Sequence, residues 1–302
     1  MAYVIAGIVV VIAAAGLAAA MRFRKPRRSY TLGNLIDFLE LTPDDARVLK
    51  QPSYSSHRIP KRSGGYRLLE VPDEQTKMLQ RRLLRRVLSK LSAHPAAVGF
   101  ETAKSIVDAA RPHTSKGVVI RIDITDFFQS TTTERVAAWF RGIGWDADSV
   151  DFLTKFVCHD GHLPQGAPTS PRLSNLINAG MDTVLQRIAT ERGGTYTRYA
   201  DDITISFRRL SGRRARGVVQ HVRRTLTAFG YRVNTRKTRI LRNHQQQTVT
   251  GLVVNRTISI PRKQRRKLRA IRHRIANGQP ATMTTDQLAG WDAFLAMVEQ
   301  QR

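Results

Sequence analysis

The stretch TYTRYADDITISF (residues 195–207) decides the fold of this chain. Its alternating Thr, Tyr, Ile and Phe side chains are typical of a β-strand, in which successive residues point to opposite faces of the sheet. Two adjacent aspartates, Asp201 and Asp202, interrupt the alternation. Both carboxylates reach solvent on one side only if the chain turns at this point. We therefore predict a β-hairpin whose turn carries both aspartates.

A second strand leads to the same place in the fold. KGVVIRID (116–123) is an apolar, β-branched run that predicts a buried strand, and it ends at Asp123. If this strand neighbours the hairpin in one sheet, its carboxylate lies beside Asp201 and Asp202. Three like charges in one place are unfavourable unless something neutralises them.

A pair of Mg²⁺ ions would neutralise such a cluster, because hard cations take carboxylate oxygens as ligands. Two metal ions held there would clamp the attacking and leaving oxygens of an in-line phosphoryl transfer. The tetrapeptide Tyr-Ala-Asp-Asp (199–202) is a weak signal by itself, since so short a match arises by chance. The two-metal hypothesis therefore needs support from the rest of the chain.

The flanking segments predict an α+β fold. SHRIPKRSGGYRLLEVPD (56–73) predicts two short strands around a Ser63-Gly64-Gly65 turn. Apolar residues at helical spacing predict helices over 74–91, 131–140, 169–185, 215–230, 261–278 and 288–298. Further strands are predicted at 231–234 and 248–255. This order around the aspartates predicts an α+β sandwich with the helices on one face of the sheet.

The composition of the chain indicates a polyanionic partner. Its 302 residues include 50 Lys and Arg against 23 Asp and Glu, a formal net charge of +27. Such a charge favours nucleic acid, although a solvated basic face or attraction to anionic lipid would also produce it. Cys158 is the single cysteine, which excludes a disulfide framework, and the scattered histidines disfavour a structural zinc site.

The beginning of the chain has a different character. Residues 2–21 carry no charge, and the basic run RFRKPRR (22–28) follows directly. About 20 apolar residues span a bilayer, so we predict a transmembrane anchor over residues 1–24. Because the basic run follows the apolar one, the prediction is a single-pass protein of the inner membrane with its catalytic body in the cytoplasm. An Ala-rich lead or an over-extended gene start, with a cytoplasmic protein, is the alternative.

The predicted helix over 261–278 is strongly basic. Leu268, Ile271 and Ile275 form its apolar stripe and leave the charges facing outward. We predict that it contacts a nucleic-acid backbone through Arg262, Lys263, Arg265, Arg266, Lys267 and Arg269.

From about Arg58 to Asn255 the chain resembles a reverse transcriptase, motif by motif and in order. The matching motifs are IPKRSGGYRLLEVP (59–72), RIDITDFF (121–128), LPQGAPTSPRLSNL (163–176), RYADD (198–202) and GYRVNTRKTR (230–239). The resemblance implies an RNA-directed DNA polymerase shaped like a right hand. Its expected parts are fingers over 25–117, an RRM-like palm over 118–255 with 130–164 partly fingers, and a short helical thumb over 256–302.

The resemblance also assigns roles to individual residues. Asp123 and Asp201 would be the principal metal ligands and Asp202 a supporting carboxylate, with Ile124 at the same metal site. The nucleotide-binding residues would be Lys61, Arg62, Arg67, Asp126, Phe127, Phe128, Gln165 and Lys237.

Within that set the implied tasks differ. Lys61 or Arg62, together with Arg67, would hold the incoming phosphates, and the backbone amides of Asp126 and Phe127 would bind the triphosphate. Phe128 would exclude a 2′-OH, Gln165 would line the pocket, and Lys237 would lie near the catalytic centre. From the sequence alone, Phe128 could equally be a core residue, and the basic residues could be plain solvated charges.

Two blocks resemble those of retron reverse transcriptases. TVTGLVVN (248–255) contains their Val-Thr-Gly block, and DAARPH (108–113) resembles their Asn-Ala-x-x-His block, with Ala109 where Asn is expected. A retron enzyme copies a structured RNA into DNA that stays attached to it, and serves anti-phage defence. The implied partners are the RNA template, the RNA–DNA hybrid, dNTPs, an effector protein and, through the anchor, a membrane.

Two alternatives stay open. One is another bacterial reverse transcriptase, of a different defence system or resembling those of group II introns. The other is a non-catalytic, membrane-tethered RNA-binding protein, against which the intact set Asp123, Gln165, Asp201 and Asp202 argues.

Overall fold

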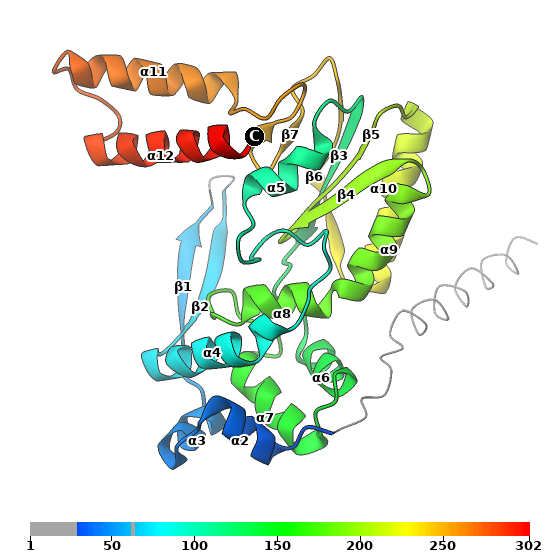
Figure 1. Ribbon diagram of the computed structural model, residues 1–302, viewed down its shortest axis with the longest axis vertical. Helices are drawn as coiled ribbons and strands as arrows, with labels where there is room; N and C mark the ends of the chain where they lie inside the picture. Colours follow the sequence, from blue (N-terminus) through cyan, green and yellow to red (C-terminus); the bar gives the residue numbers. More distant parts are fainter. Residues whose placement is uncertain (1–28, 62–63) are drawn as a thin grey trace, which may run out of the picture. The chain divides into compact units, whose positions relative to one another are not determined.

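The computed structural model describes residues 29–61 and 64–302, which form two compact units. The helical unit combines residues up to 94 with residues 126–180. The sheet unit combines residues 95–125 with residues 181–302. Figure 1 shows the elements of both units, coloured along the chain.

The helical unit consists of helices around one apolar core and one two-stranded sheet. Its elements are α2 (Leu32–Leu39), α3 (Pro43–Lys50), β1 (Tyr54–Pro60), β2 (Tyr66–Pro72), α4 (Glu74–Arg86), η1 (Leu88–Lys90), α6 (Thr133–Gly142), α7 (Ala147–Val157) and α8 (Ser170–Ile177). Leu35, Leu79, Phe140 and Phe156 are fully buried together in its core. Strands β1 and β2 pair in antiparallel fashion, so the predicted hairpin over 56–73 is confirmed.

The sheet unit carries the other elements of the fold. They are α5 (Ile106–Ala110), η2 (Arg111–His113), β3 (Val118–Thr125), α9 (Ala179–Thr190), β4 (Gly194–Tyr199), β5 (Asp202–Phe207), α10 (Gly212–Ala228), β6 (Arg232–Arg242), β7 (Thr248–Val249), β8 (Leu252–Val253), α11 (Arg262–Ala276) and α12 (Thr285–Gln301). The four long strands form one antiparallel sheet in the order β4-β5-β3-β6. The hairpin predicted over 195–207 is therefore confirmed, and β3 is its neighbour.

The pleat of this sheet separates two faces. Tyr196 faces α9, whose Asp182 accepts its hydroxyl hydrogen bond, and α10 packs against β3 and β6. Figure 1 shows α9 and α10 on the same side of the sheet. Asp123 and Asp202 lie on alternate positions and therefore project from the opposite face. The predicted α+β arrangement with helices covering one sheet face is confirmed for these strands.

Two helix predictions need correction. The helix predicted over 169–185 is two helices, because α8 ends at Ile177 with Asn178 as its C-cap and α9 starts anew at Ala179. The Asn178 amide makes the break favourable, since it donates to the Ser174 carbonyl at 2.8 Å. The helix predicted from Thr131 begins instead with Thr132 as its N-cap, because the Thr131 hydroxyl donates to the Phe127 carbonyl at 3.1 Å.

The prediction of a membrane protein also needs correction. No helix within residues 29–61 and 64–302 is long and apolar enough to cross a bilayer. The longest, α10 and α12, have 17 residues each, about 26 Å of helix, whereas a hydrocarbon core is about 30 Å thick. The predicted location in the inner membrane is therefore wrong by this structure. The proposed anchor over residues 1–24 lies outside the described residues.

Candidate active site

The two aspartates of the hairpin lie at its tip. Tyr199 pairs with Asp202, so Ala200 and Asp201 form a two-residue turn. Ala200 has a φ of +55°, a conformation that suits glycine better than alanine. On its other side, the Ile124 amide of β3 donates to the Asp201 carbonyl at 2.9 Å. The backbone of the turn is therefore tied to the neighbouring strand.

The register of β3 and β5 brings the predicted carboxylates together. Asp123 pairs directly with Asp202, and paired residues project from the same face of a sheet. Asp201 immediately precedes Asp202, in the adjoining turn. The structure therefore places Asp123, Asp201 and Asp202 at one end of the sheet, as the sequence predicted.

Two basic side chains contact this carboxylate cluster. The Lys237 ammonium lies 2.8 Å from Asp123 Oδ2, and the Arg121 guanidinium lies 3.5 Å from Asp202 Oδ1. Lys237 belongs to a bulge, because the register of β6 against β3 shifts between Asn234 and Arg239. A bulge re-aims the side chains of its strand, which explains how Lys237 reaches across to Asp123.

The pKa values show that the cluster remains short of positive charge. Burial, followed by the charges of Asp202 and Asp123, raises the pKa of Asp201 to about 6. Burial likewise raises the pKa of Asp202, against the lowering effect of Arg121. The hydrogen bond to Asp123 raises the pKa of Lys237. Among the described residues, no Lys or Arg forms an ion pair with Asp201, so this carboxylate gains most from an added cation.

The donor set fits a hard divalent cation. It consists of carboxylate oxygens from adjacent strands, the ligand type that Mg²⁺ and Mn²⁺ prefer. In this structure, Lys237 and Arg121 hold one oxygen each of Asp123 and Asp202. They partly replace the positive charge that a metal ion would bring.

A second group of potential metal ligands, which the sequence did not predict, lies in the helical unit. Ligand atoms of Glu70, His159 and Asp160 lie within 4.8 Å of one another. Asp160 and Gly161 both have positive φ, and they connect His159 to its antiparallel partner His162. Asp-Gly is the favoured pair for such a turn, so the string His-Asp-Gly-His was the available signal. His162 in turn lies 3.0 Å from the buried Glu70 carboxylate.

The predicted phosphate-binding residues lie on the β1–β2 hairpin of the helical unit. Lys61 and Arg67 are both exposed there, and the Lys61 amide donates to the Gly65 carbonyl at 2.9 Å, closing the hairpin. Arg62 lies outside the described residues. These positions leave both described side chains accessible to a ligand, and their roles stay predictions.

Gln165 lies in the loop that precedes α8. The Gln165 carbonyl accepts from the Glu70 amide at 3.0 Å. Gly166 has a φ of +145°, and a Cβ there would lie 2.7 Å from the Glu70 carbonyl oxygen. Only glycine therefore lets this loop approach β2 so closely.

The three residues after β3 belong to the helical unit. Asp126 has a positive φ of 47°, so the chain changes direction there. Phe127 is buried, while Phe128 is half-buried against the apolar core, and their rings are 5.4 Å apart. Phe128 is thus partly a core residue, and its role as a sugar gate stays a prediction.

The two retron-like blocks pack against each other, and His113 of the first block contacts the hairpin that carries Asp201 and Asp202. His113 is fully buried, and its ring nitrogens lie 2.6 Å from Ser206 Oγ and 2.8 Å from Thr197 Oγ1. Burial lowers the pKa of His113 to about 3, which keeps the ring neutral. The hydroxyl of Thr250, in the Val-Thr-Gly block, donates to the Ile106 carbonyl at 3.0 Å. His113 therefore supports the hairpin from the face opposite α9, and the Val-Thr-Gly block contacts the α5 segment that carries His113's block.

Helix α11 has the polarity that the sequence predicted. Leu268 and Ile271 are both buried, and Leu268 belongs to the apolar core of the sheet unit. The predicted nucleic-acid-binding residues Arg262, Lys263, Arg265, Arg266, Lys267 and Arg269 are all exposed. Their contact with nucleic acid stays a prediction.

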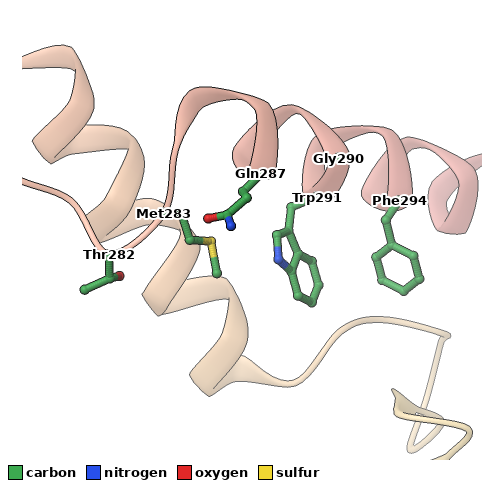
Figure 2. A pocket seen from close by; sticks show the side chains of 6 residues that line it. All are labelled: Thr282, Met283, Gln287, Gly290, Trp291 and Phe294. Atoms are coloured by element: carbon green, nitrogen blue, oxygen red, sulfur yellow. The ribbon is translucent and has the colours of Figure 1, made fainter. Parts of the chain in front are cut away.

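A largely apolar pocket of about 540 Å³ lies beside α12. Figure 2 shows Gln287, Trp291 and Phe294 on one side of this helix, with Met283 in the segment before it. The lining residues are Thr282, Met283, Gln287, Gly290, Trp291 and Phe294. None of them is a carboxylate or another predicted catalytic residue, so this pocket is not the candidate active site.

Comparison with protein families and curated proteins gives consistent matches. The family described as Reverse transcriptase (RNA-dependent DNA polymerase) matches residues 59–254. The retron Mx65 reverse transcriptase of Myxococcus xanthus is 35% identical over 268 residues, which cover 82% of this chain and 62% of that protein. The retron Ec86 reverse transcriptase of Escherichia coli is 35% identical over 237 residues, covering 78% and 72%. The chain thus spans less than two thirds of the Myxococcus protein.

Two solved telomerase structures share the fold. Apo telomerase from Candida tropicalis, truncated from its C-terminal domain, gives a TM-score of 0.50 at 14% identity, over 69% of this chain and 55% of that one. Telomerase from Candida albicans, in complex with a fragment of telomeric RNA, gives a TM-score of 0.51 at 10% identity, over 76% and 48%. At these identities the likeness concerns the polymerase fold alone.

Proposed function

Because the chain belongs to the reverse transcriptase family, and within it to the retron type, we propose that it synthesises DNA on an RNA template. The observation that carries this proposal is the convergence of Asp123, Asp201 and Asp202 at one end of the sheet. A protein that only bound RNA would have no use for three carboxylates there, since phosphates repel them.

Reverse transcriptases work with divalent metal ions, and we propose two Mg²⁺ ions for this one. When bound, they would supply the charge that stabilises an in-line phosphoryl transfer. Asp123 and Asp201 would hold them, with Asp202 in support. The Ile124 amide would keep Asp201 in place through its carbonyl. Lys237, which already contacts Asp123, would keep positive charge next to the reacting phosphate.

The incoming nucleotide would be held by the helical unit. Lys61 and Arg67 would bind its phosphates, and the backbone amides of Asp126 and Phe127 would bind the triphosphate. Phe128 would exclude the 2′-OH, while Gln165 would line the pocket. In a right-hand description, residues 25–117 are the proposed fingers, 118–255 the palm and 256–302 the thumb.

The proposed sugar gate has a direct test. Phe128→Ala should allow ribonucleotides to be incorporated, because the smaller side chain no longer blocks the 2′-OH. The measurement is the ratio of kcat/KM for a dNTP to that for the matching rNTP. If the ratio equals the wild-type value in a variant with normal thermal stability, Phe128 acts only in the core.

The template is proposed to be a structured RNA, copied into DNA that stays attached to it. The exposed basic residues of α11 would hold the backbone of that RNA or of the RNA–DNA hybrid. This part of the proposal rests on the retron-type relatives and on the net charge of +27. The relatives' names identify no effector protein, so a role for one stays a prediction.

The decisive experiment combines primer extension with sequencing. The purified protein should extend a primer with dNTPs on an RNA template, and Asp201→Asn should remove this activity while keeping RNA affinity. Sequencing of the nucleic acid that co-purifies with the wild type should recover one structured RNA joined to DNA. Extension that persists in Asp201→Asn would refute the proposed site. Co-purified RNA without attached DNA would favour another class of bacterial reverse transcriptase.

A further inference from the structure

A buried ion pair lies directly behind the catalytic turn. Arg198 of β4 and Asp182 of α9 are both 0% exposed. The guanidinium binds the carboxylate through two parallel hydrogen bonds, Nε to Oδ1 and Nη2 to Oδ2, each 2.7 Å long. The Tyr196 hydroxyl donates to the same Oδ1 at 2.6 Å. The pair therefore has the bidentate geometry that arginine alone provides.

Burying two charges is costly, so stability alone is a weak reason for this pair. Replacing a buried ion pair by apolar residues of similar volume often leaves stability unchanged or raises it. The further contacts of the Arg198 guanidinium therefore indicate its role better than the ion pair does.

The remaining nitrogen of Arg198 reaches the turn itself. Its Nη1 donates to the Ala200 carbonyl at 3.2 Å. Ala200 precedes Asp201 and has a φ of +55°. A non-glycine residue in this conformation is held there by its surroundings. The guanidinium supplies one of the contacts that hold the turn in this shape.

The backbone around Arg198 closes the other side of the turn. The Arg198 amide donates to the Ala96 carbonyl at 2.7 Å, and its own carbonyl accepts from the Val98 amide at 2.8 Å. Gly99 follows, and a Cβ there would lie 2.9 Å from the Ala200 amide nitrogen. The turn is thus packed against residues 96–99 and leaves little room to move.

We propose that Asp182 and Arg198 are positioning residues for the reaction: Asp182 orients the guanidinium, and the guanidinium fixes the Ala200 carbonyl and with it the carboxylate of Asp201. The inference rests on the proposed function, since it assigns a role within the same site. Lysine cannot replace Arg198, because one ammonium cannot bind Asp182 in bidentate fashion and reach Ala200 as well.

The test uses three variants of the full chain. Arg198→Lys keeps the charge, Arg198→Met removes it, and the triple variant Asp182→Leu/Tyr196→Phe/Arg198→Met removes the whole polar group without leaving a buried charge unpaired. We expect kcat to fall about 10- to 100-fold in all three, as for residues that orient metal ligands. KM for dNTP and the affinity for RNA should stay within about twofold, and the Mg²⁺ concentration for half-maximal activity should rise.

Hydrogen–deuterium exchange gives a readout that needs neither metal nor substrate. The Ile124 amide, which donates to the Asp201 carbonyl, should exchange at least about tenfold faster in the triple variant. The Ile120 amide, in the middle of the same strand, should keep its wild-type rate. Arg82→Met is the matched control, because Arg82 forms a half-buried pair with Asp45 in the helical unit. It should change neither kcat nor exchange at Ile124.

Three results would overturn the inference. The first is a triple variant with wild-type kcat and Mg²⁺ dependence, and the second is unchanged exchange at Ile124. The third is full activity in Arg198→Lys, which would make the bond to Ala200 dispensable. If the wild type itself does not polymerise DNA, the proposed function fails, while the exchange comparison still decides whether Arg198 fixes the turn.

Discussion

The hairpin that carries Asp201 and Asp202 and helix α11 are both rich in charge, and they use it in opposite ways. In and around the hairpin, individual charges are held in specific pairs, as Arg198 with Asp182 at 2.7 Å and Lys237 with Asp123 at 2.8 Å. Along α11 the basic side chains are exposed and project from one helix that contains no acidic residue. The role of the hairpin therefore depends on the position of each charge. The proposed role of α11 depends on the number of its charges.

Because of this difference, we expect the hairpin to determine the rate of phosphoryl transfer and α11 to determine the affinity for nucleic acid. A phosphoryl-transfer site needs groups fixed to within a fraction of an ångström, and burial against a sheet supplies that rigidity. Attraction to a phosphate backbone is a sum of screened contacts, in which one side chain can replace another. Substitutions in the two regions should thus change different measured quantities.

The largest effect is expected at Asp123. Asp123→Asn removes a carboxylate from the proposed metal site and should lower the rate of DNA synthesis by about 10³-fold, as for the loss of a group that stabilises a transition state. RNA affinity, measured by filter binding, should stay within about twofold. The matched control is Asp292→Asn, since Asp292 forms an exposed pair with Arg272. Weak RNA binding by Asp123→Asn would show that the two regions are not separable.

Substitution of Lys237 tests whether a single basic residue affects kcat through its position next to Asp123. Lys237→Met should lower kcat about 10- to 100-fold, because it removes the charge held 2.8 Å from Asp123. Lys155→Met is the control, as Lys155 forms an exposed pair with Asp151 in the helical unit. Single-turnover kinetics at saturating RNA measures the effect. Equal rates for both variants would show that Lys237 is an ordinary solvated charge without a specific role in the reaction.

Substitutions in helix α11 test whether the basic side chains contribute additively to nucleic-acid affinity. The triple variant Arg265→Gln/Arg266→Gln/Lys267→Gln should flatten the slope of log K against log salt for a nucleic-acid duplex by about two to three, since each phosphate neutralised contributes about 0.9. At saturating RNA, kcat should change little. The triple variant Arg213→Gln/Arg214→Gln/Arg216→Gln in α10 removes the same charge elsewhere and should leave the slope unchanged. Identical slopes in both variants would show that net charge alone matters.

The smallest expected effect concerns stability. The pKa of Asp201 is raised to about 6 by burial and by Asp202 and Asp123. In the unfolded chain this carboxyl ionises near pH 4, so the folded state loses stability as the pH rises from about 4 through about 6. The full shift of about two pKa units corresponds to about 3 kcal/mol, which solvent screening at this partly exposed carboxyl reduces. Asp201→Asn removes that loss and should raise the free energy of unfolding above pH 6 by about 1 kcal/mol. Thermal unfolding measured at pH 4 and pH 7.5 checks this. A gain of the same size at pH 4 would contradict the assignment to ionisation.

Local patterns in the sequence predicted the hairpin, its neighbour β3 and the apolar stripe of α11. Alternation with period two fixes which residues of a strand share a face, so Asp123 and Asp202 could be placed together without coordinates. The order of the motifs identified the family because each motif is also a local signal, a short contiguous string of residues.

Contacts between distant segments could not be predicted in this way. The bulge that aims Lys237 at Asp123 depends on the pairing of β6 with β3, and the pair of Arg198 with Asp182 joins a strand to a helix. The break at Asn178 was missed because apolar periodicity continues across it. The group of Glu70 with His159 was missed because nearly 90 residues separate its members.

The division of the chain between the two units has a consequence for how the protein is made. The chain passes from one unit to the other near residues 94, 125 and 180, so neither unit is a continuous stretch of sequence. On the ribosome, β3 emerges long before β5, with which it pairs. The pairing of β3 with its sheet neighbours must therefore wait until the whole second segment of the helical unit has been synthesised. Such long-range pairing slows folding, and no single cut would yield two independently folding fragments.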